Sequence, residues 1–217
     1  MPTPTKITRE QVLGRAIEIV DREGAEALSM RGLAESLGAK APSLYRYFPN
    51  KISLELAVVD QGNRKLLECL KGAAGLAALG DEWIAVGETY VAFARAKPNL
   101  YGLMMERRAG FAAGSAVGAS GRELWGFLLR VTGGLEGGGA EMGSAVGNSE
   151  IGVGIGAEVG SGEVNSGDIW RAVALWFFLH GFVSLDGAGR FGASGVEDAF
   201  AADLKALRNG FQAVLRA

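Results

Sequence analysis

The chain has 217 residues, 48% of them apolar, and a formal net charge of −2 at pH 7. This length and apolar content suffice to bury a core, so they exclude a chain that is disordered throughout. The sequence has no uninterrupted apolar run of about 18 residues to cross a bilayer, and its first residues lack the apolar centre of a secretory signal. The single cysteine, Cys69, cannot form an intramolecular disulfide. We therefore expect a cytoplasmic protein without a membrane span.

Four helices are predicted before residue 71, and they carry start and stop signals of their own. Thr8 with Gln11 forms a capping box ahead of the first helix, and Gly24 ends it. Ser29 is a typical cap for the second helix, and Pro42 suits the first turn of the third. The predicted ranges are 8–24, 29–38, 42–49 and 50–70.

Helical patterns continue after residue 80. The predicted ranges are 83–97, 100–106, 120–131, 168–185 and 196–215. Pro98 ends the first of these helices, because the residue before a proline disfavours the helical conformation. Between residues 133 and 167, thirteen of 35 residues are glycine, which disfavours a helix and predicts a flexible loop. The alternation typical of strands is absent outside this stretch, so the predicted fold class is all-α.

The segment from Ser29 to Lys51 predicts a helix-turn-helix that binds DNA. A helix in the major groove needs short polar or aromatic side chains on its outer face, because the groove is only about 12 Å wide. Ser43 and Tyr47, four residues apart, share one face of the third helix. Three cations flank that face: Lys40, Arg46 and Lys51.

The distribution of charge favours the same part of the chain. Residues 1–65 hold ten Lys and Arg against eight Asp and Glu, whereas the remainder holds twelve against sixteen. The positive charge is therefore concentrated where electrostatic attraction to phosphate requires it.

Two stretches resemble a known family. The run LYRYFPNK at 44–51 resembles the L-Y-x-[HYF]-[FV]-x-[ND]-K motif of TetR-type transcriptional repressors, and the resemblance extends over about 8–59. The run WFFLHGFVSL at 176–185 resembles the W-x-x-x-H-G signature of TetR-type proteins with a WHG-type ligand domain. The resemblance implies a helix-turn-helix DNA-binding domain at 1–50 and a helical effector-binding and dimerisation domain at 51–217.

The resemblance also implies which residues contact DNA. They are Ser29, Arg31, Lys40, Ser43, Tyr45, Tyr47 and Lys51. We add Arg46, because an arginine beside this face suits a guanine edge, and we assign Ser43, Tyr47 and Arg46 to base reading. The other residues are expected to bind backbone phosphates. The expected partner is thus a double-stranded DNA operator.

In this family the second domain binds a small effector and carries the dimer interface. The resemblance therefore implies a homodimeric repressor that an apolar or aromatic effector releases from its operator. Residues expected around the effector supply aromatic and thioether surface, with the single histidine beside them. They are Trp83, Tyr90, Phe93, Tyr101, Met104, Met105, Trp125, Phe177 and His180. The last two helices are expected to pack against their copies in a four-helix interface.

Two alternatives stay open. One is a DNA-binding regulator without a ligand, in which a filled core replaces the pocket. The other is a helical enzyme that uses surface carboxylates, for example Glu106 with Glu123. The sequence has no zinc motif, nucleophile elbow or Walker lysine, so no enzyme activity, cofactor or metal is predicted.

Overall fold

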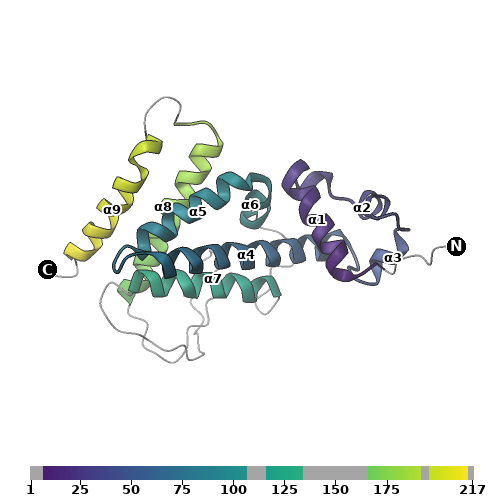
Figure 1. Ribbon diagram of the computed structural model, residues 1–217, viewed down its shortest axis with the longest axis horizontal. Helices are drawn as coiled ribbons and strands as arrows, with labels where there is room; N and C mark the ends of the chain where they lie inside the picture. Colours follow the sequence, from purple (N-terminus) through teal and green to yellow (C-terminus); the bar gives the residue numbers. More distant parts are fainter. Residues whose placement is uncertain (1–6, 107–115, 134–165, 192–195, 215–217) are drawn as a thin grey trace. The chain divides into compact units, whose positions relative to one another are not determined.

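The structure is a computed structural model that describes residues 7–106, 116–133, 166–191 and 196–214. Within these ranges the chain forms α-helices and one 3-10 turn, and it contains no strand (Figure 1). The predicted all-α fold class is therefore confirmed.

Contacts between residues divide the chain into two compact units. The first unit holds residues 1–63 and 97–120, and the second holds residues 64–96 and 121–217. Two of the three divisions fall inside helices, namely α4 (Lys51–Leu76) and α7 (Ala116–Gly133), and the third follows Ala96. The domain boundary predicted at residue 50 stays a prediction.

The first unit contains mostly short helices. Its elements are α1 (Arg9–Glu23), the 3-10 turn η1 (Ala25–Ala27), α2 (Met30–Ser36), α3 (Pro42–Tyr45), the start of α4, α6 (Pro98–Met105) and the start of α7. The capping box of α1 forms as predicted, since the hydroxyl of Thr8 accepts from the amide of Gln11 at 3.2 Å and the side chain of Gln11 accepts in return. Gly24 ends α1 with φ +86°, which favours glycine. The Ser29 hydroxyl caps α2.

The core of the first unit lies between α1, α2 and the segment that follows them. Its buried apolar side chains include Val12, Ala16, Val20, Leu33, Leu44 and Phe48. Helix α6 is tied to the end of α1, because Lys97 forms an ion pair with Asp21 and the Asn99 amide donates to the Asp21 carbonyl at 3.0 Å. Helix α6 also approaches α4 closely: a Cβ at Gly62 would lie 2.8 Å from the sulfur of Met104.

The second unit is built from longer helices. They are α5 (Glu82–Ala96), α8 (Ser166–Gly187), α9 (Val196–Val214) and the later parts of α4 and α7. Helix α5 packs against both α8 and α9. The contact with α9 is close, since a Cβ at Gly87 would lie 2.6 Å from Leu204 Cδ1. The contact with α8 includes an ion pair of 2.6 Å between Arg95 and Asp186.

Several helix ends differ from the predicted ones. Helix α3 stops at Tyr45 rather than near Pro49, and the chain continues as a turn through Arg46 and Tyr47. Helix α4 continues to Leu76 instead of residue 70. Helix α6 begins at Pro98 itself, where the missing amide proton of proline costs no helical hydrogen bond. Most of the glycine-rich segment predicted as a loop, residues 134–165, lies outside the described residues.

Candidate nucleic-acid interface

Helices α2 and α3 form the helix-turn-helix predicted for Ser29–Lys51. The turn passes through Gly38, whose φ of +63° lies in the left-handed region. The amide of Ala39 donates to the carbonyl of Ala34 at 2.9 Å and closes the end of α2. Leu44 is fully buried, so it anchors α3 and leaves the neighbouring residues to face outward. This is the local geometry that a DNA-reading helix requires.

The predicted DNA-contacting residues all lie in the first unit, but they differ in exposure. The exposed ones are Ser29, Arg31, Lys40, Tyr45 and Arg46, and the half-buried ones are Ser43, Tyr47 and Lys51. Tyr45 is 47% exposed, which leaves its ring and hydroxyl accessible. The Ser29 hydroxyl accepts from the amide of Gly32 at 3.1 Å, so its role as a helix cap is established in the structure.

The cations of this segment divide into two kinds. Arg31 pairs with Glu35 at 2.9 Å, and Lys51 lies 3.5 Å from the buried carboxylate of Glu55. Lys40 and Arg46 have no carboxylate at ion-pair distance among the described residues. An unpaired cation offers its full charge to a phosphate, whereas a paired one must first exchange its partner. Lys40 and Arg46 are therefore the best-placed phosphate or base contacts of the segment.

Tyr47 has polar contacts that its sequence position does not predict. Its hydroxyl donates to the main-chain carbonyl of Ile7, forty residues earlier in the chain. Nη2 of Arg46 donates to the same hydroxyl at 3.0 Å, and Cζ of Arg46 lies 4.8 Å from the centroid of the Tyr47 ring. The assignment of Tyr47 to base reading stays a prediction. These contacts compete with it, because the hydroxyl already donates its proton within the protein.

Arg9 is a candidate contact that sequence reasoning missed. It is exposed at the first position of α1, and its Cζ lies 4.8 Å from the centroid of the Phe48 ring, at the end of the helix-turn-helix. Like Arg46, it has no carboxylate at ion-pair distance among the described residues. No local pattern connects Arg9 with Phe48, because their proximity depends on the fold.

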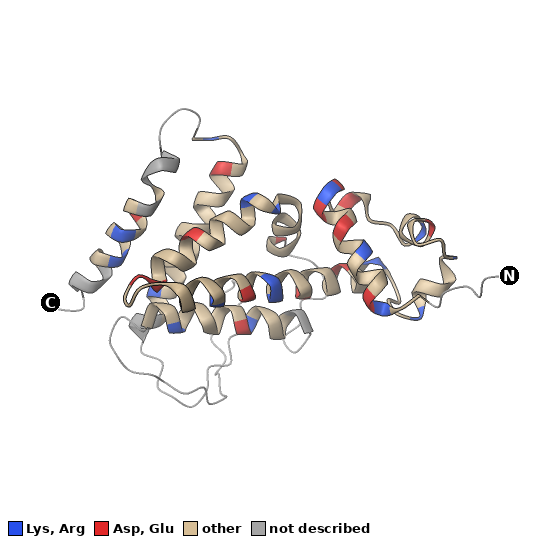
Figure 2. Cartoon of the chain, in the orientation of Figure 1, with Lys and Arg blue, Asp and Glu red and all other residues tan. Residues whose placement is uncertain are grey.

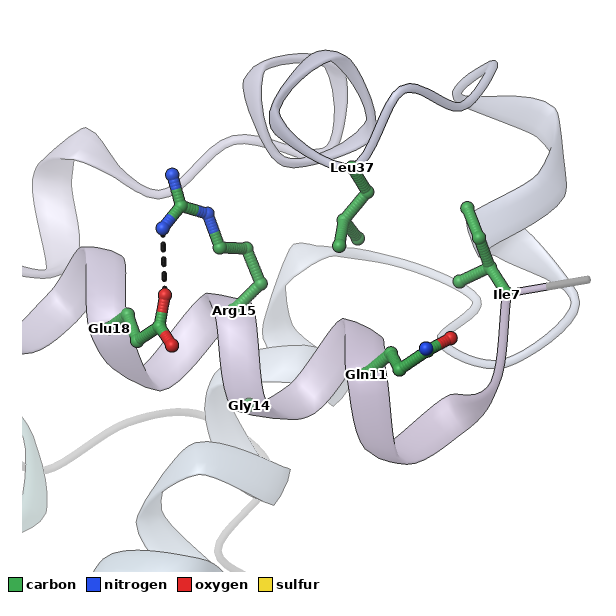
Figure 3. A pocket seen from close by; sticks show the side chains of 6 residues that line it. All are labelled: Ile7, Gln11, Gly14, Arg15, Glu18 and Leu37. Carbon is green, nitrogen blue, oxygen red and sulfur yellow. Dashed lines mark hydrogen bonds and ion pairs between the residues drawn. The ribbon is translucent and has the colours of Figure 1, made fainter. Parts of the chain in front are cut away.

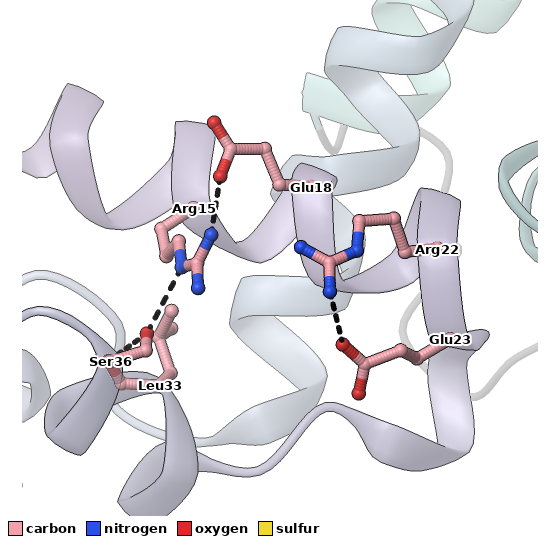
Figure 4. Close-up of polar contacts among 6 residues, drawn as sticks. All are labelled: Arg15, Glu18, Arg22, Glu23, Leu33 and Ser36. Carbon is pink, nitrogen blue, oxygen red and sulfur yellow. Dashed lines mark hydrogen bonds and ion pairs between the residues drawn. The ribbon is translucent and has the colours of Figure 1, made fainter.

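A shallow, open groove of about 420 Å³ lies elsewhere in the first unit (Figure 3). Its lining residues are Ile7, Gln11, Gly14, Arg15, Glu18 and Leu37. No predicted DNA or effector residue lines it. Two contacts fix the side chain of Arg15 (Figure 4). It pairs with Glu18 at 2.7 Å and donates to the hydroxyl of Ser36 at 3.3 Å. Arg15 therefore ties α1 to α2.

The residues predicted around an effector are divided between the two units. Those in the second unit are Trp83, Tyr90, Phe93, Trp125, Phe177 and His180, and those in the first are Tyr101, Met104 and Met105. Trp83 and Tyr90 are only 1% exposed, so they belong to a packed interior. Phe177 differs from the set because it is 54% exposed. The effector site as a whole stays a prediction.

His180 is half-buried on α8 and stacks against Trp176. The ring centroids lie 5.6 Å apart with an interplanar angle of 9°. Burial lowers the pKa of His180 below its ordinary value of 6.5, because the charged imidazolium loses its hydration. The histidine is therefore held as the neutral ring at pH 7.

Helix α8 exposes several large apolar side chains. Trp170 is 64% exposed and Phe177, two turns later, is 54% exposed. Among the described residues, one helical window, Ile169–Gly187, is long and apolar enough to cross a membrane by length and composition, and a third of it is buried inside the chain. Figure 2 shows the contrast with α1, whose ribbon carries several blue and red segments, whereas the ribbon of α8 is mostly tan.

Two sequence families match the chain. The family described as "Bacterial regulatory proteins, tetR family" matches residues 12–58, and the family described as "Tetracyclin repressor-like, C-terminal domain" matches residues 83–207. The chain belongs to the TetR family of regulatory proteins. The first match contains the whole helix-turn-helix described above. Both matched families are regulators, which supports the prediction that this TetR-family protein is not an enzyme.

Curated relatives of this TetR-family protein match over part of their length. An uncharacterised HTH-type transcriptional regulator, Rv0681 of Mycobacterium tuberculosis, is 30% identical over 98 residues, which are 45% of each chain. The HTH-type transcriptional repressor DrrR1 of Streptomyces coeruleorubidus is 44% identical over 63 residues, 29% of this chain and 23% of the relative. The matched part thus spans less than half the length of these relatives.

Solved structures share the fold over nearly the whole chain. A protein of unknown function from Rhodococcus sp. RHA1 has a TM-score of 0.73 at 21% identity, covering 96% of this chain and 98% of that one. TetR-Q116A from Acinetobacter baumannii AYE, in complex with minocycline, has a TM-score of 0.56 at 18% identity, covering 96% and 98%. These likenesses show that the chain has the TetR fold.

Proposed function

We propose that this protein is a transcriptional repressor that binds a double-stranded operator through α2 and α3. The observation that carries the proposal is the pair of exposed cations, Lys40 and Arg46, beside the exposed Tyr45; neither cation has a carboxylate partner within the described part of the chain. Such cations bind phosphate and guanine edges, and an exposed tyrosine hydroxyl donates to phosphate. The name of DrrR1, a transcriptional repressor, supports repression over activation.

The proposed regulator acts as a homodimer in the cytoplasm. The exposed apolar residues of α8, Trp170 and Phe177, support an interface in which α8 and α9 pack against their copies. Monomeric soluble proteins rarely expose large contiguous apolar patches, so such a patch indicates a protein contact. Two-fold symmetry would place the two recognition helices one DNA turn apart or a multiple of it, about 34 to 36 Å per turn.

The proposal includes release from DNA by a small apolar or aromatic effector. Minocycline bound to the Acinetobacter protein is a multi-ring ligand on a similar fold, which supports an effector of this class. The stacked Trp176 and His180 support a WHG-type ligand domain. A regulator without a ligand is the second candidate, and the dense packing of Trp83 and Tyr90 favours it.

Duplex binding tests the proposed function first. Labelled fragments from the DNA that flanks the coding sequence are titrated with the protein at about 50 mM salt, and fluorescence anisotropy reports binding. We expect one fragment to bind at least about 1,000 times more tightly than a shuffled duplex of equal length. Equal affinity for every fragment would limit the protein to non-specific binding, and no binding at low salt would overturn the proposal.

A thermal-shift screen of apolar and aromatic metabolites tests the effector. A ligand present at about 100 times its dissociation constant adds about 2.7 kcal/mol of stability. A compound that raises the melting temperature and lowers operator affinity supports effector release, because the coupling between two sites is reciprocal. A screen without such a compound favours the regulator that has no ligand.

A further inference from the structure

The Tyr47 hydroxyl has a full set of partners inside the protein. A phenol has one proton to donate and lone pairs that accept. The proton goes to the Ile7 carbonyl, and a lone pair accepts from Nη2 of Arg46 at 3.0 Å. The hydroxyl therefore has no second proton for an outside acceptor while the bond to Ile7 is made.

A duplex presents mostly acceptors to such a hydroxyl. Phosphate oxygens, guanine N7 and O6, adenine N7 and thymine O4 all accept, and only the amino groups of cytosine and adenine donate in the major groove. To donate to a phosphate, Tyr47 would have to leave the partly buried Ile7 carbonyl without its partner. The hydroxyl of Tyr45 makes no hydrogen bond with any of the residues that the structure describes, and the residue is 47% exposed. Of the two tyrosines, Tyr45 is the one equipped to touch DNA directly.

Two contacts join the side chain of Arg46 to that of Tyr47. One of its five N–H donors points to the Tyr47 hydroxyl, and its guanidinium lies 4.8 Å from the centre of the same ring. The remaining donors face no carboxylate among the described residues, and the side chain is exposed. A guanidinium fixed in this way loses less conformational freedom when it binds a phosphate or a guanine.

We propose that Tyr47 is a positioning residue, which fixes the Arg46 guanidinium for DNA and ties the end of the helix-turn-helix to Ile7, just before α1. Arg46 makes the contact, and Tyr47 acts through it. This inference rests on the proposed DNA binding and changes the role assigned to Tyr47 from base reading to support. The structural basis of this inference is the pair of hydrogen bonds that links the Arg46 guanidinium to the Tyr47 hydroxyl and the Tyr47 hydroxyl to the Ile7 carbonyl.

A double-mutant cycle tests the inference. The full-length protein and its Tyr47→Phe, Arg46→Ala and double variants are titrated with a fluorescein-labelled mixed-sequence duplex of about 30 base pairs. In the presence of Arg46, Tyr47→Phe should weaken binding about three- to ten-fold, the usual effect of one lost hydrogen bond. In the Arg46→Ala background the same change should alter affinity less than about two-fold, because the group that Tyr47 positions is gone.

The salt dependence separates contact from support. Arg46→Ala should reduce the slope of log K against log salt by about 0.9, the value for one phosphate contact on B-DNA. Tyr47→Phe should leave the slope unchanged, since it removes no charge. A purely structural role for Tyr47 would weaken binding equally in both backgrounds, and that result would overturn the inference while leaving the proposed function intact.

Tyr45→Phe is the matched control, because it deletes the same hydroxyl from a tyrosine two residues away. Its effect should be equal with and without Arg46, since no contact joins the two side chains. Arg46→Lys is a second probe that leaves Tyr47 in place. The lysine variant keeps the charge but lacks the planar guanidinium, so its DNA affinity should not change on Tyr47→Phe. A loss of affinity as large as in the wild-type background would contradict the inference. A wild-type protein that binds no duplex in dilute buffer would overturn the proposed function and this inference with it.

Discussion

The helix-turn-helix at Ser29–Lys51 and helix α8 expose opposite kinds of side chain. The first presents cations and hydroxyls, including Lys40 and Arg46, which pair with no carboxylate in the ranges that the structure describes. The second presents large apolar rings, with Trp170 and Phe177 more than half exposed. A polyanion binds the first kind of surface through charge and hydrogen bonds, whereas the second kind is stabilised by removing apolar area from water. The two surfaces therefore suit the two proposed partners, a duplex and a second copy of the chain.

The two units also differ in how their helices meet. In the first unit Gly62 admits Met104, a flexible side chain that adapts its shape. In the second unit Gly87 admits Leu204, which is fully buried and branched. Close packing of this kind makes the second unit less tolerant of added volume.

Loss of the exposed ring of Phe177 should have the largest effect. Phe177→Ser removes a candidate hot spot from the proposed interface, and a hot spot of at least about 2 kcal/mol raises the dissociation constant of the homodimer about 30-fold or more. Sedimentation velocity over a range of concentrations measures it. Lys71→Ser, a change of an exposed residue on α4, is the control and should leave the dimer unchanged. Dimers of unaltered strength in Phe177→Ser would show that α8 does not form the interface.

A methyl group added at Gly87 should destabilise the second unit. Overpacking against Leu204 costs about 1 to 3 kcal/mol, which exceeds the roughly 0.5 to 1 kcal/mol that alanine gains over glycine within a helix. Urea unfolding gives the free energy directly. Gly62→Ala should cost less, because Met104 can move aside. Gly72→Ala has open space around it and should stabilise; an equal loss at all three glycines would remove the contrast between the units.

Arg9 is a candidate DNA contact outside the helix-turn-helix. Arg9→Ala should reduce the slope of log K against log salt by about 0.9 for a mixed-sequence duplex, because a cation without a carboxylate partner is lost. Arg22→Ala, at the far end of α1 and paired with Glu23 at 3.6 Å, is the matched control and should leave the slope unchanged. Equal slopes for wild type and Arg9→Ala would confine the contacts to residues after α1.

The smallest expected effect is a pH dependence of the second unit. Burial lowers the pKa of His180 in the folded protein below 6.5, so the unfolded chain binds the proton more tightly. Stability should therefore fall as the pH drops through 6.5 toward the folded pKa and level off below it. Calorimetry at pH 7.5 and 5.5 measures the change. His180→Gln should lose less stability over this interval; an identical loss would assign the dependence to carboxylates instead.

Helix starts and the fold class could be predicted from the sequence because their causes are local. Thr8 with Gln11, Gly24 and Ser29 act on backbone groups within four residues, and each behaves as its residue type requires. The predicted end of α3 near Pro49 was too late, because the proline is a local stop signal and nothing in the sequence marks the earlier turn after Tyr45. The sequence did not predict Arg9 as a candidate contact, because its aromatic partner, Phe48, is 39 residues away along the chain.

The sequence by itself determined the helical fold, the helix-turn-helix and the family, because periodicity, caps and a short motif encode all three. Only the tertiary structure decided which polar groups are free to meet DNA. The donor of Tyr47 is directed to Ile7, forty residues away, while Lys40 and Arg46 keep their charge uncompensated. Hydrogen bonds and ion pairs between distant residues depend on where the chain folds back on itself, and no local pattern records that.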